Sequence, residues 1–77
     1  MPEELVSYLV RCLVDHPDEV RVERTERDGA VVLQLHVAPD DRGKVIGRGG
    51  RLIRSLRTVV RASGTKSGER RLLELAE

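Results

Sequence analysis

A glycine-rich segment near the middle of the chain carries residue types that could bind a phosphate. It reads Gly43-Lys44-Val45-Ile46-Gly47-Arg48-Gly49-Gly50-Arg51. Glycine lacks a Cβ atom, so a phosphodiester can approach its backbone closely, and free N–H groups at the start of a following helix would point toward it. Four side chains would add positive charge: Lys44, Arg48, Arg51 and Arg54. The alternative is a plain tight turn whose glycines serve only geometry.

Two common nucleotide-binding loops do not fit this segment. A Walker loop would continue into Lys-Ser or Lys-Thr, whereas Gly50 is followed by Arg51-Leu52, and no predicted strand leads directly into the turn. The dinucleotide pattern Gly-x-Gly-x-x-Gly is absent as well. The segment is therefore not predicted to hold a nucleoside triphosphate or a dinucleotide.

The net charge of +1 conceals a separation of charge along the 77 residues. Residues 1–41 hold four basic side chains against ten acidic ones, a balance of −6. Residues 42–71 hold ten basic side chains against Glu69 alone, a balance of +9. A segregated basic stretch in a near-neutral chain is typical of a protein that binds a polyanion. The alternative is a solvated, arginine-rich helix face.

The sequence shows no catalytic or metal-binding group of residues. His16 and His36 are far apart and have no cluster of ligands around them, so no metal site is predicted. The single cysteine, Cys12, stands on or beside the apolar stripe of a predicted helix and is predicted to be a small packing residue. Tyr8 on the same helix is predicted to pack or to contact a partner. We therefore expect no enzyme, no cofactor and no disulfide framework.

The first half of the chain predicts a helix followed by a hairpin. Leucines and valines recur at helical spacing over residues 3–15, and Pro17 ends that helix because the residue before a proline avoids the helical conformation. Apolar and polar residues alternate over residues 20–23 and again over residues 31–37. Asp28-Gly29 lies between these two runs, which is a hairpin signal.

The second half predicts two helices and a last strand. Either residue of Asp40-Asp41 can cap a short helix over 40–46, and a longer helix follows over about 51–63. The longer helix has an apolar arc of Leu52, Ile53, Leu56, Val59 and Val60, and a roughly opposite arc of Arg51, Arg54, Arg57 and Arg61. A turn-rich, mobile segment at 63–68 then leads to a short strand at 71–75. The predicted order is α-β-β-α-α-β.

This arrangement resembles a KH domain. The run Val45-Ile46-Gly47-Arg48-Gly49-Gly50, between a short and a longer helix, resembles the KH Gly-x-x-Gly loop, which clamps the backbone of about four nucleotides. The extra helix and strand precede the core, as in the bacterial, type II version. Together with Leu13-Val14-Asp15-His16-Pro17 and Val37-Ala38-Pro39, the chain is similar to the KhpA family of small bacterial RNA-binding proteins.

The resemblance implies an α+β fold in which helices pack on one face of a three-stranded sheet. It implies one domain over 1–77, with a core at about 30–75 preceded by a helix and strand at 3–26. The implied RNA-binding residues are Gly47, Arg48, Gly49, Gly50, Lys44, Arg51 and Arg54, with Val45 and Ile46 as an aliphatic groove wall. Gly49 departs from the polar side chain expected there, so Arg48 is the only charged residue within the loop.

The resemblance also implies a function. We expect non-catalytic binding of single-stranded RNA, as an RNA chaperone or post-transcriptional regulator in the cytoplasm, linked to cell shape. Expected partners are RNA and a KhpB-like KH protein, a second copy of the chain, or both, without a membrane. The alternative is a protein–protein dimerisation module whose contact with RNA is incidental.

Overall fold

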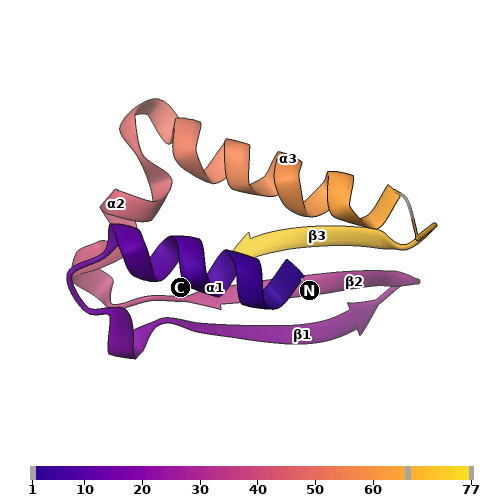
Figure 1. The fold of residues 1–77 in the computed structure, drawn as a ribbon, viewed down its shortest axis with the longest axis horizontal. Coiled ribbons are helices and arrows are strands. Elements are labelled where there is room, and N and C mark those ends of the chain that lie inside the picture. The colour runs from indigo at the N-terminus through magenta and orange to yellow at the C-terminus, as the bar shows by residue number, and fades with distance from the viewer. Residues whose placement is uncertain (1, 66, 77) are drawn as a thin grey trace.

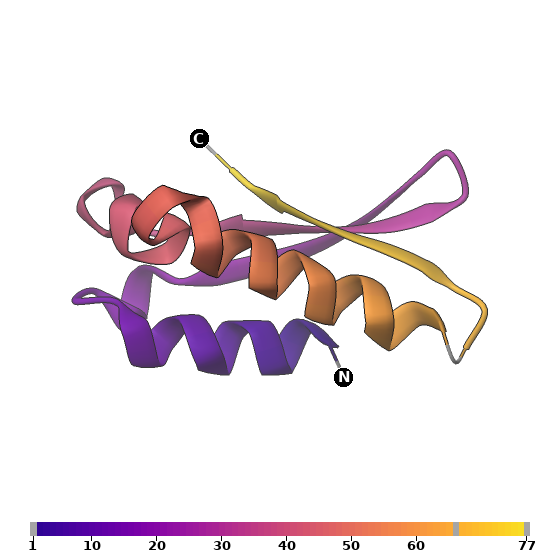
Figure 2. The ribbon, with the colours of Figure 1, turned by 90° about the horizontal axis from the view of Figure 1, so that it is seen from above.

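The computed structural model describes residues 2–65 and 67–76. Three helices cover one face of a three-stranded sheet (Figures 1 and 2). In chain order the elements are α1 Pro2–Leu13, β1 Arg21–Arg27, β2 Ala30–His36, α2 Arg42–Ile46, α3 Arg51–Thr65 and β3 Arg70–Leu75. Short 3₁₀ turns at Pro17–Glu19, Pro39–Asp41 and Arg48–Gly50 connect them. The predicted α+β class and element order are confirmed.

The sheet is built around β2, which pairs antiparallel with β1 and parallel with β3. The hairpin between β1 and β2 turns at Asp28 and Gly29, whose φ angles are 54° and 79°. Two positive φ angles in a two-residue loop match the twist of the strands on either side. Aspartate and glycine adopt such angles more readily than most residues, which is why Asp-Gly predicts a hairpin. β1 reaches Arg27 although its second half is entirely polar, because that half is paired with the apolar β2.

The core lies between the sheet and the helices. Alternate residues of β2, Val31, Leu33 and Leu35, point toward the helices and are buried. The helices and β3 contribute Val6, Val10, Ile53, Leu56, Val60 and Leu73 to the same cluster. All of these side chains are aliphatic, so the core is formed without any aromatic residue.

The ends of two helices differ from the prediction. α1 ends at Leu13, two residues early, and α3 continues to Thr65, so Ser63 and Gly64 are helical rather than part of a mobile turn. Gly64 is buried against the start of β3, and its carbonyl accepts a 2.9 Å hydrogen bond from the Glu69 N–H. This long-range packing extends the helix. Lys66, within the predicted mobile segment, lies outside the described residues.

Gly64→Ala should destabilise the protein. A Cβ atom at Gly64 would lie 2.1 Å from the Glu69 carbonyl oxygen, so α3 and β3 would have to move apart. We expect a loss of about 1–3 kcal/mol in urea unfolding, as for other overpacked sites. The control is Gly43→Ala in α2, where nothing lies within 4 Å of the added atom. That variant should be neutral or more stable by up to about 1 kcal/mol, and equal stability of the two variants would contradict the packing argument.

Candidate nucleic-acid interface

The turn between α2 and α3 depends on glycine at its first position. Gly47 has φ 78° and ψ 173°, and a Cβ atom there would lie 2.7 Å from Leu52 Cβ. The Gly50 N–H donates to the Gly47 carbonyl at 3.1 Å and closes the turn. A side chain at Gly47 would therefore disturb both the backbone and the first turn of α3.

The next glycines leave their backbone open to a ligand. Gly49 and Gly50 also have positive φ angles, 63° and 75°, but nothing lies within 4 Å of the Cβ position of either one. Arg48 and Gly49 are exposed, and Gly50 is half-buried. A phosphodiester can therefore reach this backbone beside the N-terminus of the 15-residue helix α3.

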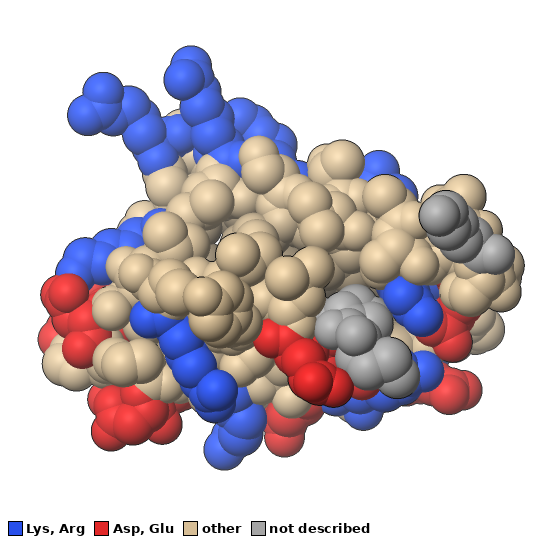
Figure 3. All heavy atoms as spheres, viewed as in Figure 1, with Lys and Arg blue, Asp and Glu red and all other residues tan. Residues whose placement is uncertain are grey.

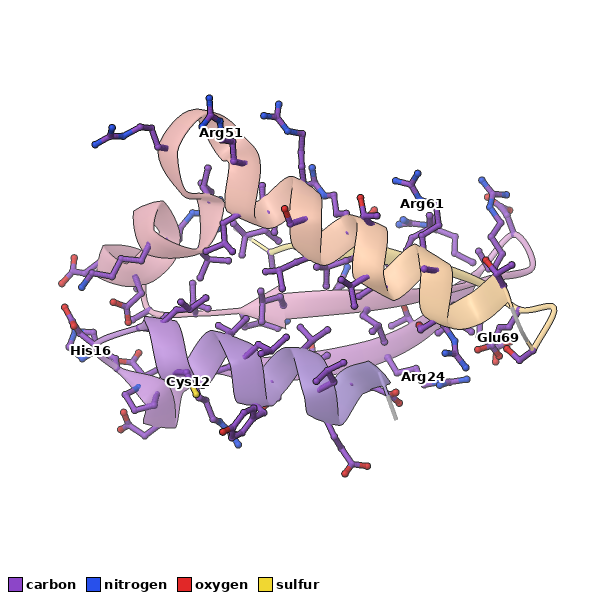
Figure 4. The ribbon with its side chains drawn as sticks, turned by 45° about the horizontal axis from the view of Figure 1, so that its top comes forward. Cys12, His16, Arg24, Arg51, Arg61 and Glu69 are labelled. Atoms are coloured by element: carbon purple, nitrogen blue, oxygen red, sulfur yellow. The ribbon has the colours of Figure 1, made fainter. Side chains whose placement is uncertain are left out.

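Three arginines surround this open backbone. Arg48, Arg51 and Arg54 are exposed, and no carboxylate of residues 2–65 or 67–76 forms an ion pair with them. Figure 3 shows basic side chains projecting from the end of the molecule where α2 turns into α3, while acidic and basic side chains are mixed along the opposite side. Arg51 extends away from the helices in Figure 4. These guanidinium groups are available to an anion.

Lys44 is less available than these arginines. Its ammonium donates to Asp15 Oδ2, and it lies 3.9 Å from Asp41 Oδ1. The hydrogen bond and charge of Asp15 raise the pKa of Lys44, and the same hydrogen bond lowers the pKa of Asp15. The pair is therefore intact at neutral pH; it is lost as the pH falls through the lowered pKa of Asp15 or rises through the raised pKa of Lys44. A phosphate would have to compete with Asp15 for Lys44.

Asp41 connects the first helix to the site. Its carboxylate is fully buried and accepts hydrogen bonds from the N–H groups of Asp15 and His16, at 3.1 and 3.0 Å. The prediction that Asp40 or Asp41 caps the following helix is wrong, because neither side chain makes such a cap. The Asp41 side chain instead holds the segment after α1 against the start of α2. In the sequence, the only sign of a role for Asp41 is its position beside a predicted helix start, and that position suggested a cap on the same helix rather than a contact with a distant segment.

Two other expectations about individual side chains are also wrong. Val45 is completely buried in the core, so its side chain cannot form an exposed groove wall; Ile46 is half-buried and keeps part of its surface. Cys12 is exposed rather than packed, because α1 turns Val6 and Val10 toward the sheet and leaves Cys12 on the outer side.

Among the described residues, no group of His, Cys, Asp and Glu side chains lies close enough together to hold a metal ion. No described helix is long and apolar enough to cross a membrane.

Comparison with known sequences identifies the family. A sequence model described as KhpA/KhpB, KH domain matches residues 3–75. This chain belongs to the KhpA/KhpB KH-domain family. It is 48% identical over 77 residues to the RNA-binding protein KhpA of Treponema pallidum, covering 100% of this chain and 96% of the relative. It is 44% identical over 73 residues to KhpA of Bacillus subtilis, covering 95% of this chain and 90% of the relative.

The family match agrees with the architecture. KhpA of Aquifex aeolicus is 44% identical over 75 residues, which covers 97% of this chain and 95% of that protein. These relatives carry the name of an RNA-binding protein rather than the name of an enzyme. The matched residues 3–75 include the glycine turn, all of α3 and β3.

Asp41→Asn should destabilise the protein although it keeps the shape of the side chain. One amide oxygen can still accept a hydrogen bond, but the amide nitrogen would face a second backbone N–H and leave it without an acceptor. We expect urea unfolding to show a loss of about 1–3 kcal/mol. The control, Asp40→Asn, changes the same charge at an exposed neighbour and should stay within about 0.5 kcal/mol of the natural chain. If both variants lost the same stability, charge rather than the buried hydrogen bonds would be the cause.

Proposed function

We propose that this chain binds single-stranded RNA, without catalysis, by clamping the phosphate backbone at Gly47, Arg48, Gly49 and Gly50. The observation that carries the proposal is the open backbone of Gly49 and Gly50 beside arginines that have no carboxylate partner in residues 2–65 and 67–76. The names of the relatives, RNA-binding protein KhpA, support the same ligand.

The physical mechanism is electrostatic and depends on shape. The backbone N–H groups of Arg48 and Gly49 donate to the phosphates, whereas those of Gly50 and Arg51 already donate within the turn. The side chains of Arg48, Arg51 and Arg54 neutralise the phosphates. Lys44 adds a further contact when its ammonium leaves the Asp15 carboxylate and binds a phosphate instead. Three or four such contacts give a log–log salt slope of roughly −2 to −3 for single strands. Ile46 offers limited apolar surface to a base, so base preference is weak and unpaired strands are favoured over duplex.

A single clamp of this kind has limited affinity, so a second clamp is part of the proposal. Two linked KH grooves raise avidity without new kinds of contact. We propose pairing with a KhpB-like KH protein or with a second copy of the chain, each chain acting as one KH unit with its core at about 30–75. In this arrangement the protein works in the cytoplasm as an RNA chaperone or post-transcriptional regulator connected with cell shape.

One feature favours the second candidate function, a protein–protein module. Leu5, Tyr8 and Cys12 form a stripe at helical spacing on the outer side of α1, with Leu5 47% and Tyr8 65% exposed. A groove of about 490 Å³ lies beside it, between α1 and β1. It is lined by Tyr8, Val20 and Val22 and by the polar and charged residues Glu3, Glu4, Ser7, Arg11 and Arg21. Exposed apolar surface on a small domain indicates a protein interface. A second KH domain is the occupant that we propose.

Arg48→Asp combined with Gly49→Asp separates the two candidates. The change places two carboxylates where the phosphate should lie, and aspartate tolerates the positive φ of Gly49 better than most residues. We expect affinity for a short unpaired RNA, measured by fluorescence anisotropy, to fall at least tenfold, which is about 1.4 kcal/mol. The melting temperature and the sedimentation behaviour should change little.

The control is Arg27→Asp with Gly29→Asp, which makes the same change of charge at the hairpin, outside both the glycine turn and the groove between α1 and β1. Its RNA affinity should fall much less than that of the turn variant. Unchanged RNA binding in a folded turn variant would show that the glycine turn is the wrong site. If the turn variant lost RNA binding but still bound its protein partner and kept its role in the cell, the main function of the protein would be protein–protein interaction.

A further inference from the structure

The groove between α1 and β1 fits a different kind of ligand from RNA. Its volume of about 490 Å³ is within the usual range of ligand-binding sites. We infer that it binds an extended peptide segment of a partner protein, which adds as a further strand to the free edge of β1. This inference goes beyond the proposed RNA binding and does not depend on it.

The edge of β1 has backbone groups available for another strand. Among the described strands β1 pairs with β2 alone, so alternate residues of β1 point their N–H and C=O groups away from the sheet. Apart from that ladder, no backbone–backbone hydrogen bond within the described part of the chain involves residues 21–27. A row of unpaired groups of this kind is a template for pairing with another chain.

The first half of β1 is the part that can receive a strand. Figures 1 and 2 show α1 running beside this half, while the second half extends past the N-terminal end of α1. Val20, Arg21 and Val22 line the groove between the two elements. Residues 24–27 are all exposed, and three of these four are charged, which opposes edge pairing in the second half.

The ion pair between Arg24 and Glu3, at 3.3 Å, gives the direction of the groove. It places the middle of β1 beside the N-terminal end of α1. Arg21 comes three residues earlier, about 10 Å along a strand, and so lies toward the C-terminal end of α1, where Arg11 is. Arg24 neutralises Glu3, so Glu4 carries the free negative charge at the N-terminal end.

The groove is therefore negative at one end and positive at the other. None of the ion pairs formed among residues 2–65 and 67–76 engages Glu4, Arg11 or Arg21. Between the charged ends, Tyr8 and the half-buried Val22 offer apolar surface. A segment that carries a basic, an apolar and an acidic residue in matching order complements this distribution.

The geometry of the two elements gives the spacing and direction of that segment. Glu4 and Arg11 are seven residues apart, about 10 Å along a helix. In an extended chain, every second side chain points to the same face, and three such side chains span about 13 Å. Antiparallel pairing is the more stable kind, and an antiparallel partner of β1 would run from the Glu4 end to the Arg11 end. The expected segment is basic-x-apolar-x-acidic.

A peptide strand fits this groove better than RNA does. Its lining contains two glutamates and two arginines, so the groove has no net charge to attract a polyanion. The second KH domain of the proposed function is a folded partner for the exposed stripe on the outer side of α1. The groove and the free edge of β1 instead match a segment that is extended.

The test uses two synthetic peptides of the same composition. Each has seven residues and blocked ends. The first carries lysine, valine and glutamate at its second, fourth and sixth positions with serine or threonine elsewhere, and the second has the reversed sequence. Fluorescence anisotropy should show that the natural chain binds the first peptide at least fivefold more tightly. Because composition and net charge are the same, the difference reports the order of charges along the groove.

Exchanging the two free charges of α1 should remove that preference. Glu4→Arg with Arg11→Glu keeps the net charge and changes two exposed residues. This variant should bind the first peptide at least fivefold less tightly than the natural chain does, and the reversed peptide at least as tightly as the first. The control, Asp40→Arg with Arg61→Glu, makes the same reversals at exposed residues outside the groove and should keep the natural preference.

Amide hydrogen exchange of the natural chain tests the strand addition without any variant. The first peptide should slow exchange at those N–H groups of residues 21–23 that point away from β2, and leave the hairpin at Asp28 and Gly29 unchanged.

Three results would overturn the inference: equal affinity for the two peptides, binding of neither peptide at about 1 mM, or peptide binding without slower exchange at residues 21–23. Protection of those residues by a second copy of the chain that excludes the peptide would overturn it as well and assign the groove to a folded partner. Each of these results leaves the proposed RNA binding intact.

Discussion

The close approach of Leu52 to Gly47 is the constraint on which the candidate site depends. Only a residue without a side chain allows α3 to begin so near the end of α2, with 2.7 Å between Leu52 Cβ and the position of a Cβ on Gly47. Leu52 in turn packs against the core. The packing of α3 therefore fixes the turn, and the fixed turn holds Arg48, Gly49 and Gly50 outward. A flexible glycine loop would lose more conformational entropy on binding RNA.

The site and the core support each other through polar contacts as well. The buried carboxylate of Asp41 holds the segment after α1, and Asp15 in that segment holds Lys44. This arrangement places α2 between two anchors, Asp41 before it and Gly47 after it. It also divides the cations into two groups, one engaged by carboxylates within the fold and one left for a ligand. Net charge alone, +1 for the whole chain, gives no sign of that division.

Local patterns in the sequence predicted most of the fold. Helical spacing located α1 and α3, alternation located β2, and Asp28-Gly29 located the hairpin, because each signal depends on neighbouring residues. The expectations that were wrong depend on contacts between distant residues. Val45 is buried by elements far along the chain, Asp41 bonds to residues 25 and 26 positions away, and Gly64 extends α3 because β3 covers it. The chemistry of the glycine turn could be read from its residue types, whereas the pairing of Lys44 with Asp15 could not.

The most direct test of the central claim, that the glycine turn holds an RNA backbone, is to follow the backbone amide shifts of the isotope-labelled protein by NMR as a short unpaired RNA is added. The account predicts that the largest changes occur at Arg48, Gly49, Gly50 and Arg51 and continue along α3, while the hairpin at Asp28 and Gly29 is unaffected. Changes confined to α1 and β1, with the glycine turn unaffected at saturating RNA, would contradict it.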